Sequence, residues 1–349
     1  MNTLLQPLFL IFRNSPGHFT TFHWYPLRMQ YTKQLTIYFL MKNKPLLSIC
    51  IPTYNRAPFL RECLFHILSA MKDGVTSDDV IIIISDNAST DDTKEVVKSF
   101  QKKYTNIQYF CNKKNIGGDR NVIQVASYAK TPYIWFFSDD DVMISGALKK
   151  MLFVIKSHHP EAIICNLDLI DKDGHMLTHN VLRLKKDKLL KTKKQLFTFF
   201  EYAFFLPIDW YITCLTNTIV SKRLFEKNVG MVMNAFDSSS SNFLHSGLIY
   251  YNAQDFAIYI ISKSIAKFRS GNRSFGPDES TKKKEYLLFL YTILKRHYHY
   301  IYQANNKNMS VRFKSLFFLK NISRDLRYTF VKLFGIDISQ VLINLFEKK

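Results

Sequence analysis

Four apolar runs of strand length alternate with four amphipathic segments of helix length between residues 46 and 156, and this alternation constrains the fold more than any other feature. The run VIIII within 79–84 is β-branched and uninterrupted, as in a strand that is buried on both faces. Units of this length predict an α/β fold with a mainly parallel sheet and helices on both faces. The expected strands are 46–51, 79–84, 107–111 and 133–137, and the expected helices are 58–71, 89–104, 119–129 and 145–156.

A polar cluster follows each expected strand. The clusters are, in order, PTYNR, SDNAST, NKKNIGGDRN and SDDD. The carboxyl ends of parallel strands meet at one edge of a sheet, so the four clusters are expected to converge there on a ligand site. One such cluster alone would be an ordinary turn, and the prediction therefore depends on all four.

Three adjacent carboxylates, Asp139, Asp140 and Asp141, end the apolar run YIWFF. They repel one another, so they need a positive group among them or full exposure to water. Hard oxygen ligands suit Mn²⁺ or Mg²⁺ and do not suit zinc. The sequence predicts a divalent cation shared by Asp139 and Asp141, which would stabilise the negative charge on a departing diphosphate.

Other residues in these clusters have two interpretations. Asp86 either accepts hydrogen bonds from a base or ribose, or forms an Asx turn. Arg56 either reaches a phosphate or is a solvated residue at a helix start, and Arg120 is available to a phosphate. The stretch GGDR permits close backbone approach to a ligand, but it lacks the GxGxxG spacing of dinucleotide-binding loops, which disfavours NAD.

The segments SICIPTYNR, IISDNASTDDT, NKKNIGGDRN and YIWFFSDDD, in this order and spacing, resemble glycosyltransferase family 2, whose members have the GT-A fold. The resemblance covers about residues 46–175. It implies a nucleotide-diphosphate-sugar donor, a divalent metal on an Asp-x-Asp motif, and inversion at the anomeric carbon. The donor site that it implies contains Pro52, Thr53, Tyr54, Arg56, Asp86, Gly118, Asp119, Arg120 and Asp140, with Asp139 and Asp141 as metal ligands.

An inverting displacement also needs a general base that takes the proton of the acceptor hydroxyl. In the family this base is a carboxylate downstream of the metal motif, and the second half of the chain matches the family poorly. Asp237, in the polar stretch NAFDSSSSNFLH, is the preferred base, with His245 and Asp209 as the other candidates. Each has a structural alternative, such as a packed histidine or a helix-capping aspartate.

The chain is expected to have four parts. Met41 begins the segment MKNKPLLSICIPTYNR like an ordinary bacterial start. The parts are an extension outside the native protein at 1–40, a nucleotide-sugar-binding core at 41–180, an acceptor-side part of the catalytic domain at 181–280, and a mostly helical basic tail at 281–349. In the core, Asp173-Gly174 predicts a hairpin turn within 162–177 in preference to a calcium loop, whose other ligands are missing.

Half of the net charge of +20 lies in the tail, which holds 14 Lys and Arg against 4 Asp and Glu. Its apolar residues recur every three or four positions, which predicts a basic amphipathic helix. This helix either binds the anionic inner face of the plasma membrane or presents a solvated face. Five cysteines without CxxC spacing, and no apolar run of about 18 residues, predict a cytoplasmic protein that is soluble or peripheral on that membrane.

Three functions are compatible with the residues. The first is an inverting sugar transferase in lipopolysaccharide, O-antigen or capsule synthesis, with a glycan or lipid-linked glycan acceptor. The second is a metal-dependent nucleotidyltransferase, which the replacement of a GGxGxR loop by PTYNR disfavours. The third is a basic nucleic-acid-binding protein. Three adjacent acids would repel its phosphates, so we expect no nucleic-acid partner.

Overall fold

The computed structural model describes residues 44–192, 195, 196, 199, 214–235, 244–250 and 257–271. The chain divides into two compact units, residues 1–43 and 44–349, and all described residues belong to the second unit. The predicted extension at 1–40 and the predicted basic tail at 281–349 lie outside the described residues.

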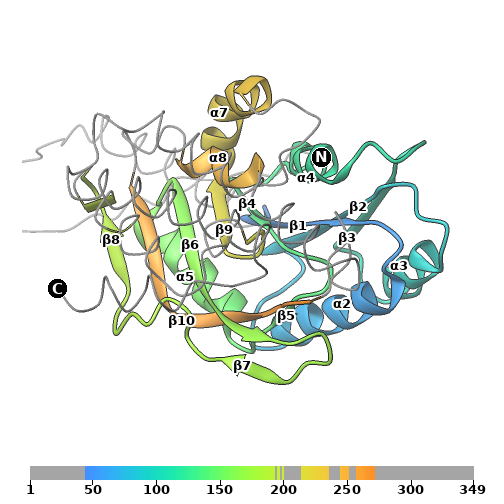
Figure 1. Cartoon of the computed structure of the whole chain (residues 1–349), viewed down its shortest axis with the longest axis horizontal. Coiled ribbons are helices and arrows are strands. Elements are labelled where there is room, and N and C mark those ends of the chain that lie inside the picture. The colour runs from blue at the N-terminus through green and yellow to red at the C-terminus, as the bar shows by residue number, and fades with distance from the viewer. Residues whose placement is uncertain are drawn as a thin grey trace, which may run out of the picture. The chain divides into compact units, whose positions relative to one another are not determined.

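The first half of the second unit contains the four predicted strand–helix units in the predicted order (Figure 1). The elements are β1 (Leu47–Thr53), α2 (Ala57–Met71), β2 (Val80–Asp86), α3 (Thr93–Gln101), β3 (Ile107–Cys111), α4 (Gly118–Ser127), β4 (Tyr133–Phe136) and α5 (Ala147–His158). Helix α5 begins two residues later than predicted, because Asp73 accepts hydrogen bonds from the Ser145 hydroxyl and the Gly146 amide and holds both residues before the helix.

The strands β3, β2, β1 and β4 are neighbours in that order, and all of them pair in parallel. Leu47 is in register with Val80 on one side and with Tyr133 on the other, and Thr53 is in register with Asp86. The ends of β1 and β2 therefore lie side by side, and β4 ends beside Cys50, three residues before the end of β1. A parallel sheet is confirmed for this half.

Beyond β4 the sheet is mixed. Its further elements are β5 (Val142–Met143), β6 (Ala162–Ile170), β7 (Met176–Thr178), β8 (Lys188–Leu190), β9 (Thr218–Ser221), α7 (Lys222–Ala235), α8 (Leu244–Tyr250) and β10 (Ile258–Arg269). Strand β9 lies antiparallel between β4 and β6, β10 is parallel to β6, and β5 is antiparallel to β10. Because β9 has only four residues, its sequence shows no period that would have revealed it.

Strands β6 and β7 form the predicted hairpin, and the turn lies at Asp173-Gly174 as predicted. The Gly174 amide donates to the Asp171 carbonyl at 3.2 Å, and the Asp171 amide donates to the His175 carbonyl at 2.9 Å. Gly174 has a φ of +93°, which a residue with a side chain rarely adopts. The sequence motif DKDG is thus explained by the turn.

Helices cover both faces of the sheet, as predicted (Figure 1). On one face α2 contacts α3 and α5, and on the other α4 packs on β1 and β2 and contacts α8. Helix α2 buries Leu60, Leu64 and Ile67, which recur at helical spacing and face the sheet. The exposed residues of α2 include Arg61 and Glu62 but also Phe65, and those of α3 are all charged or polar.

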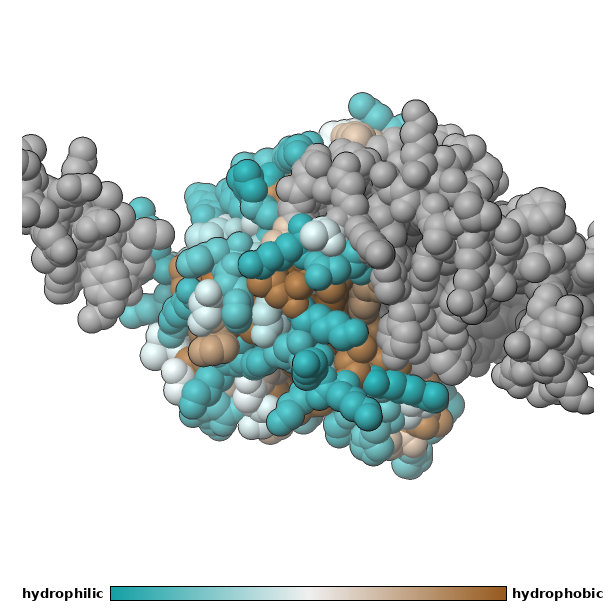
Figure 2. Space-filling model, turned by 90° about the vertical axis from the view of Figure 1, so that its left-hand side faces the viewer, coloured by the Kyte–Doolittle hydropathy of each residue, from teal (hydrophilic) through white to brown (hydrophobic). Residues whose placement is uncertain are grey.

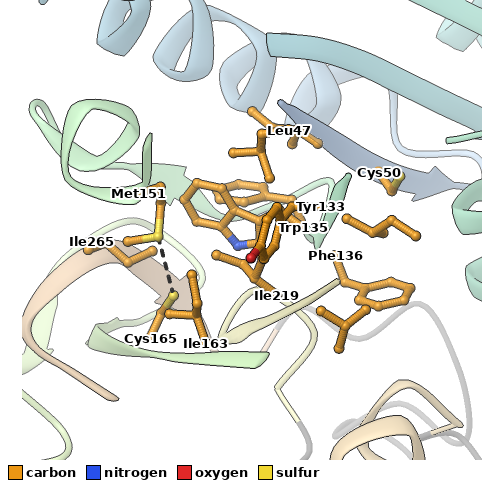
Figure 3. Packing of buried hydrophobic residues seen from close by; sticks show 14 of the residues in the cluster. Leu47, Cys50, Tyr133, Trp135, Phe136, Met151, Ile163, Cys165, Ile219 and Ile265 are labelled. Carbon is orange, nitrogen blue, oxygen red and sulfur yellow. Dashed lines mark hydrogen bonds between the residues drawn. The ribbon is translucent and has the colours of Figure 1, made fainter. Parts of the chain in front are cut away.

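The centre of the core lies under β4. Trp135 and Phe136 are fully buried among side chains that include Leu47 and Ile219 (Figure 3). The Trp135 Nε1 donates a hydrogen bond to the Thr216 carbonyl at 2.8 Å, which ties β4 to the segment before β9. Close packing of this kind gives the residues that follow β4 a rigid base.

The face that carries β8 is largely hydrophilic where the structure describes it, with hydrophobic side chains grouped near its middle (Figure 2). Lys185, Lys186, Lys188 and Lys191 are exposed around β8. The Nζ of Lys150 in α5 lies 2.7 Å from an Asp187 carboxylate oxygen and anchors this basic segment. Among the described helices, none is long and apolar enough to cross a membrane.

Candidate active site

The polar clusters that follow β1 and β4 come together at the carboxyl edge of the parallel strands. Thr53, the last residue of β1, donates a hydrogen bond from its hydroxyl to Asp139 Oδ2 at 2.7 Å. Thr53 and Asp139 are 3% and 4% exposed, so this contact is buried. The convergence that the sequence predicted is confirmed for these two clusters.

The acid triplet, Asp139 to Asp141, is buried: its residues are 4%, 6% and 0% exposed. Asp140 accepts hydrogen bonds from the Ser138 hydroxyl and from Arg56 Nη2, each at 2.6 Å. Arg56 Nη1 also lies 3.5 Å from Asp139 Oδ1. The side chain of Arg56 is 10% exposed, so Arg56 is an internal ion-pair partner and not a solvated residue at a helix start.

Asp141 is held by residues from two distant segments. The backbone amide of Arg269, the last residue of β10, donates to Asp141 Oδ1 at 2.9 Å. The Thr216 hydroxyl donates to Asp141 Oδ2 and accepts a hydrogen bond from the Ser138 amide at 3.0 Å. These donors are neutral, so they satisfy the oxygens of Asp141 without cancelling its charge.

Burial makes the ionised forms of Asp139 and Asp141 unfavourable. Desolvation raises the pKa of Asp139 to about 6, although the Arg56 guanidinium opposes the shift and the Asp140 carboxylate adds to it. The pKa of Asp141 is raised well above its usual range, first by desolvation and then by Asp140, while the hydrogen bonds from Thr216 and Arg269 act in the opposite direction. A further positive charge at this edge would favour the ionised forms.

Arg269 connects the triplet to two other elements. Its Nε donates to the Asp140 carbonyl at 3.0 Å, its Nη1 to the Lys172 carbonyl at 3.0 Å, and its Nη2 to Glu62 Oε2 at 2.9 Å. The residue is only 6% exposed. Arg269 was not among the predicted site residues, and nothing in the sequence of β10 distinguishes it from the strand's other charged residues, Lys263 and Lys267.

Phe59 of α2 lies between the two arginines of the site. Its ring centroid is 5.2 Å from the Arg56 guanidinium carbon and 5.7 Å from that of Arg269. Both distances are within the range of cation–π contacts. Arg56, Phe59 and Glu62 are spaced by three residues, so the beginning of α2 turns one stripe of side chains toward the triplet.

The donor set of this edge fits a divalent cation in its chemistry. Four carboxylates, those of the triplet and of Glu62, lie here with the guanidiniums of Arg56 and Arg269. Arg56 pairs with Asp139 and Asp140, while Arg269 pairs with Glu62 through its guanidinium and with Asp141 through its backbone amide. Counted formally, the group has two negative charges in excess, which equals the charge of one dication. The carboxylate oxygens are also the hard ligands that Mn²⁺ and Mg²⁺ prefer.

Asp86, at the end of β2, is 1% exposed and fully hydrogen bonded. Its Oδ1 accepts from the Ser89 amide at 2.8 Å, and its Oδ2 accepts from the Tyr109 hydroxyl at 2.5 Å. Desolvation and then this bond to Asp86 raise the pKa of Tyr109 above its usual range. The Asx-type bond to Ser89 supports the structural interpretation of Asp86, and its role as a donor ligand stays a prediction.

Asparagines join the clusters that follow β2 and β3. Asn87 Oδ1 accepts from Asn112 Nδ2 at 3.0 Å, and Asn87 Nδ2 donates to Asn115 Oδ1 at 2.8 Å. Asn121 of α4 donates from Nδ2 to the Ser85 carbonyl at 2.8 Å. These asparagines were not among the predicted site residues, and their signal in the sequence is their recurrence after the strands.

The stretch GGDR lies at the start of α4. Gly117 has a φ of +89°, and Gly118 begins the helix. Asp119 is half-buried and Arg120 is exposed in the first turn. Pro52 and Tyr54, on either side of Thr53, are half-buried. The contacts of these residues with a donor stay predictions.

The candidates for the general base differ in what the structure describes. Asp237 and Asp209 lie outside the described residues. His245 of α8 is 3% exposed, and its ring centroid lies 6.1 Å from that of Phe136. His245 is therefore packed within the protein, and its role as a base stays a prediction.

A second group of ligating side chains lies in the β6–β7 turn. Within the described part of the chain, Asp171, Asp173 and His175 are the one group of three whose ligand atoms lie within 4.8 Å of one another. Asp171 Oδ1 accepts from the amides of Asp173 and His175 at 2.9 Å and 2.8 Å. These bonds are those of the hairpin turn itself, and Asp173 and His175 are exposed.

Comparison with known proteins decides the family. A family model described as "Glycosyl transferase family 2" matches residues 48–229, more than half of the chain. The chain belongs to this family. It is therefore a glycosyltransferase, and sugar transfer is the one of the three hypotheses that the comparison supports.

Two relatives extend over most of the chain. The abequosyltransferase RfbV of Salmonella typhimurium is 28% identical over 262 residues, which cover 72% of this chain and 74% of the relative. The GalNAc(5)-diNAcBac-PP-undecaprenol beta-1,3-glucosyltransferase of Campylobacter jejuni is 26% identical and covers 77% and 89% respectively. Both relatives are thus named as glycosyltransferases.

The fold is shared with a solved structure. The complex of S. aureus TarS residues 1–349 with UDP-GlcNAc superposes with a TM-score of 0.55 at 17% identity, and it covers 84% of this chain and 77% of that chain. The GT-A fold that the resemblance implied is confirmed.

Proposed function

We propose that this glycosyltransferase moves a sugar from a nucleotide-diphosphate donor to a hydroxyl of a lipid-linked glycan, with inversion by a single displacement, in O-antigen, lipopolysaccharide or capsule synthesis. The observation that carries the proposal is the buried acid triplet at the carboxyl edge of the sheet, whose negative charge the guanidinium of Arg56 cancels only in part. Such an edge is where α/β sheets bind ligands. The UDP-GlcNAc in the TarS complex supports a donor of this class.

In this proposal the ends of β1 and β2 form the nucleotide pocket. Thr53 and Asp86 are register partners on neighbouring strands, so Pro52, Tyr54 and Asp86 border one surface on which a base and ribose would bind. Gly118, Asp119 and Arg120 approach the donor from the beginning of α4. The positive end of this helix and the Arg120 guanidinium favour an anionic diphosphate.

Asp139 and Asp141 would hold a Mn²⁺ or Mg²⁺ ion, and Asp140 would remain paired with Arg56. A bound dication supplies Lewis-acid stabilisation of the charge that develops on the departing diphosphate. The chain's own residues fix the geometry: Thr53 orients Asp139, and Thr216 and the Arg269 amide orient Asp141. Buried donors of this kind need no rearrangement during the reaction.

The acceptor hydroxyl must lose its proton as it attacks the sugar from the side opposite the diphosphate. We assign the role of the general base that takes this proton to Asp237, with Asp209 and His245 as alternatives. A carboxylate is suited to the step because it accepts a proton and is regenerated as the base after release to solvent.

The acceptor is proposed to be lipid-linked and the enzyme to work at the cytoplasmic, anionic face of the inner membrane. The undecaprenol-linked acceptor in the name of the Campylobacter relative supports this proposal. The net charge of +20 and the exposed lysines around β8 add to the support, because lysines near anionic headgroups contribute roughly 1 kcal/mol each.

The proposal is tested by incubating the full chain with Mn²⁺ and a panel of UDP-, GDP-, CMP- and dTDP-sugars and following slow donor hydrolysis. We expect one nucleotide class to be hydrolysed, and EDTA to stop the reaction. Asp173→Asn, in the exposed turn, is the matched control and should hydrolyse the donor at the wild-type rate. Hydrolysis that is unchanged in EDTA would overturn the metal-assisted mechanism.

A further inference from the structure

We propose that Arg56 is a built-in counter-cation of the acid triplet, and that it competes with a divalent cation at Asp139. This inference rests on the proposed metal at Asp139 and Asp141. It assigns Arg56 a role that differs from simple phosphate binding, because it makes Arg56 and the metal opponents in the free enzyme.

The contacts of Arg56 are those of a counter-ion. Its two terminal nitrogens face two different carboxylates, Asp140 at 2.6 Å and Asp139 at 3.5 Å. The side chains of all three residues are at most 10% exposed. A guanidinium keeps its charge at every pH at which proteins fold, so this positive charge is permanent.

The second arginine of the site uses its side chain differently. The Arg269 guanidinium donates to the carbonyls of Asp140 and Lys172 and to the carboxylate of Glu62. Only its backbone amide reaches a carboxylate of the triplet. Among the described residues, Arg56 thus forms ion pairs with two carboxylates of the triplet, those of Asp139 and Asp140.

A dication and this guanidinium oppose each other at the triplet. A dication on Asp139 would share a carboxylate group with Arg56, and like charges a few ångströms apart repel strongly in buried surroundings. Linkage requires the effect to be reciprocal: if the Arg56 contact weakens metal binding, metal binding weakens the Arg56 contact by the same factor. Removal of Arg56 is therefore expected to tighten metal binding.

Phe59 gives the guanidinium a contact that does not depend on the carboxylates. The Arg56 guanidinium carbon lies 5.2 Å from the centroid of the Phe59 ring, and Arg269 lies on the same ring at 5.7 Å. Cation–π attraction to the ring persists when the carboxylates are shared with another cation. Arg56 thereby remains beside the triplet. There its positive charge would attract the negative charge of a diphosphate.

The test is a titration of the full chain with Mn²⁺ in the absence of nucleotide, with free Mn²⁺ followed by electron paramagnetic resonance. We expect Arg56→Gln to bind Mn²⁺ about tenfold tighter than the wild type, because the competing charge is gone. Arg56→Lys keeps the charge without the planar fork and should lie between the two. Arg61→Gln removes the same charge from an exposed position of α2 and should bind within twofold of the wild type.

Thermal stability supplies a second readout without activity. Arg56→Gln leaves the buried carboxylates without their cation, so it should melt below the wild type in EDTA and gain more from saturating Mn²⁺. If Arg56→Gln does not fold, Arg56→Lys decides, with Mn²⁺ binding expected to be a few-fold tighter than wild type.

Two results overturn the inference and can be told apart. Unchanged or weaker Mn²⁺ binding by the Arg56 variants overturns the competition alone and leaves the proposed sugar transfer intact. A wild-type protein that binds no Mn²⁺ overturns the competition together with the proposed metal, while donor hydrolysis remains a separate test of the transferase activity.

Discussion

Two groups of acidic side chains lie near the same end of the sheet, and their surroundings are opposite. The triplet after β4 is buried and is bound by Thr53, Thr216 and Arg56. The group in the β6–β7 turn is largely exposed, and its hydrogen bonds stay within the turn. Arg269 lies between them, with its Nη1 on the Lys172 carbonyl of the turn and its amide on Asp141 of the triplet.

The opposite directions of their pKa shifts show what the two groups do for the fold. Desolvation raises the pKa of Asp139, so its charge opposes folding. At Asp171 desolvation is the largest single influence on the pKa, but the hydrogen bonds from His175 and Asp173 together outweigh it. The pKa is lowered, so the charge of Asp171 favours the turn. The close spacing of ligand atoms favours the turn as a metal site, whereas the unfavourable buried charge favours the triplet, which is the site that we propose.

The largest expected effect separates the two groups by activity. Asp141→Asn keeps the shape of the side chain and removes its charge, so the metal-assisted stabilisation of several kcal/mol is lost and turnover should fall about 10³-fold. The fold should not be weakened, because a buried charge has been removed. Sugar-transfer kinetics and thermal melting measure the two outcomes.

The turn supplies the control for this substitution. Asp173→Asn also replaces one carboxylate by an amide and should keep turnover within twofold. A comparable loss of turnover in Asp173→Asn, or full turnover in Asp141→Asn, would remove the distinction between the two groups.

The next effect is a pH dependence that arises from Asp139. Its folded-state pKa of about 6 lies above its ordinary value of 3.8, so between pH 4 and 6 the folded protein binds more protons than the unfolded chain. The contribution of Asp139 to stability is therefore most favourable below this window and is lost as the pH rises through 6. The loss is about 3 kcal/mol, because each unit of difference between the folded and unfolded pKa corresponds to 1.36 kcal/mol.

Urea unfolding in EDTA at several pH values measures this contribution. Asp139→Asn lacks the titrating group, so its stability advantage over the wild type should grow between pH 4.5 and pH 7. Parallel curves of stability against pH for the two proteins would show that burial does not raise the pKa of Asp139.

A smaller effect is expected from the hydroxyl that holds Asp141. Thr216→Val is nearly isosteric, but it leaves the Ser138 amide and Asp141 Oδ2 without their partner. The free energy of unfolding should fall by about 2 kcal/mol. Thr178→Val, at the half-buried end of β7, is the control and should change it by less than about 0.5 kcal/mol. Equal changes in the two variants would contradict the special position of Thr216.

The smallest effect concerns the backbone of the turn. Gly174→Ala places a side chain at a φ of +93°, which should lower the free energy of unfolding by about 1 kcal/mol. Gly230→Ala, within α7 and with open space around its Cβ position, should raise it by about 0.5–1 kcal/mol. Chemical denaturation of both variants measures the sign of each change in the free energy of unfolding. If Gly174→Ala stabilised the protein, the turn would not require a glycine at this φ.

The sequence predicted the parts of the fold that depend on local pattern. The four strand–helix units follow from hydrophobic period and helix-end residues, and the parallel topology then brings Thr53 and Asp139 to one edge. The hairpin at Asp173-Gly174 was found in the same way, because its turn residues are adjacent in the chain.

The partners of the triplet were not predictable, because they come from far along the chain. Thr216 and Arg269 lie 75 and 128 residues after Asp141, and each reaches it only because β9 and β10 enter the sheet beside β4 and β6. From the sequence, Arg56 was expected either to reach a phosphate or to be solvated. In the structure it instead contacts carboxylates of the triplet.

The most direct test of the central claim is the stoichiometry of Mn²⁺ binding, measured by calorimetry on three proteins. We predict one Mn²⁺ per chain for the wild type and for Asp171→Asn/Asp173→Asn, and none for Asp139→Asn/Asp141→Asn. If the ion is lost from the turn variant and kept by the triplet variant, the buried acids are not the metal site and the account is wrong.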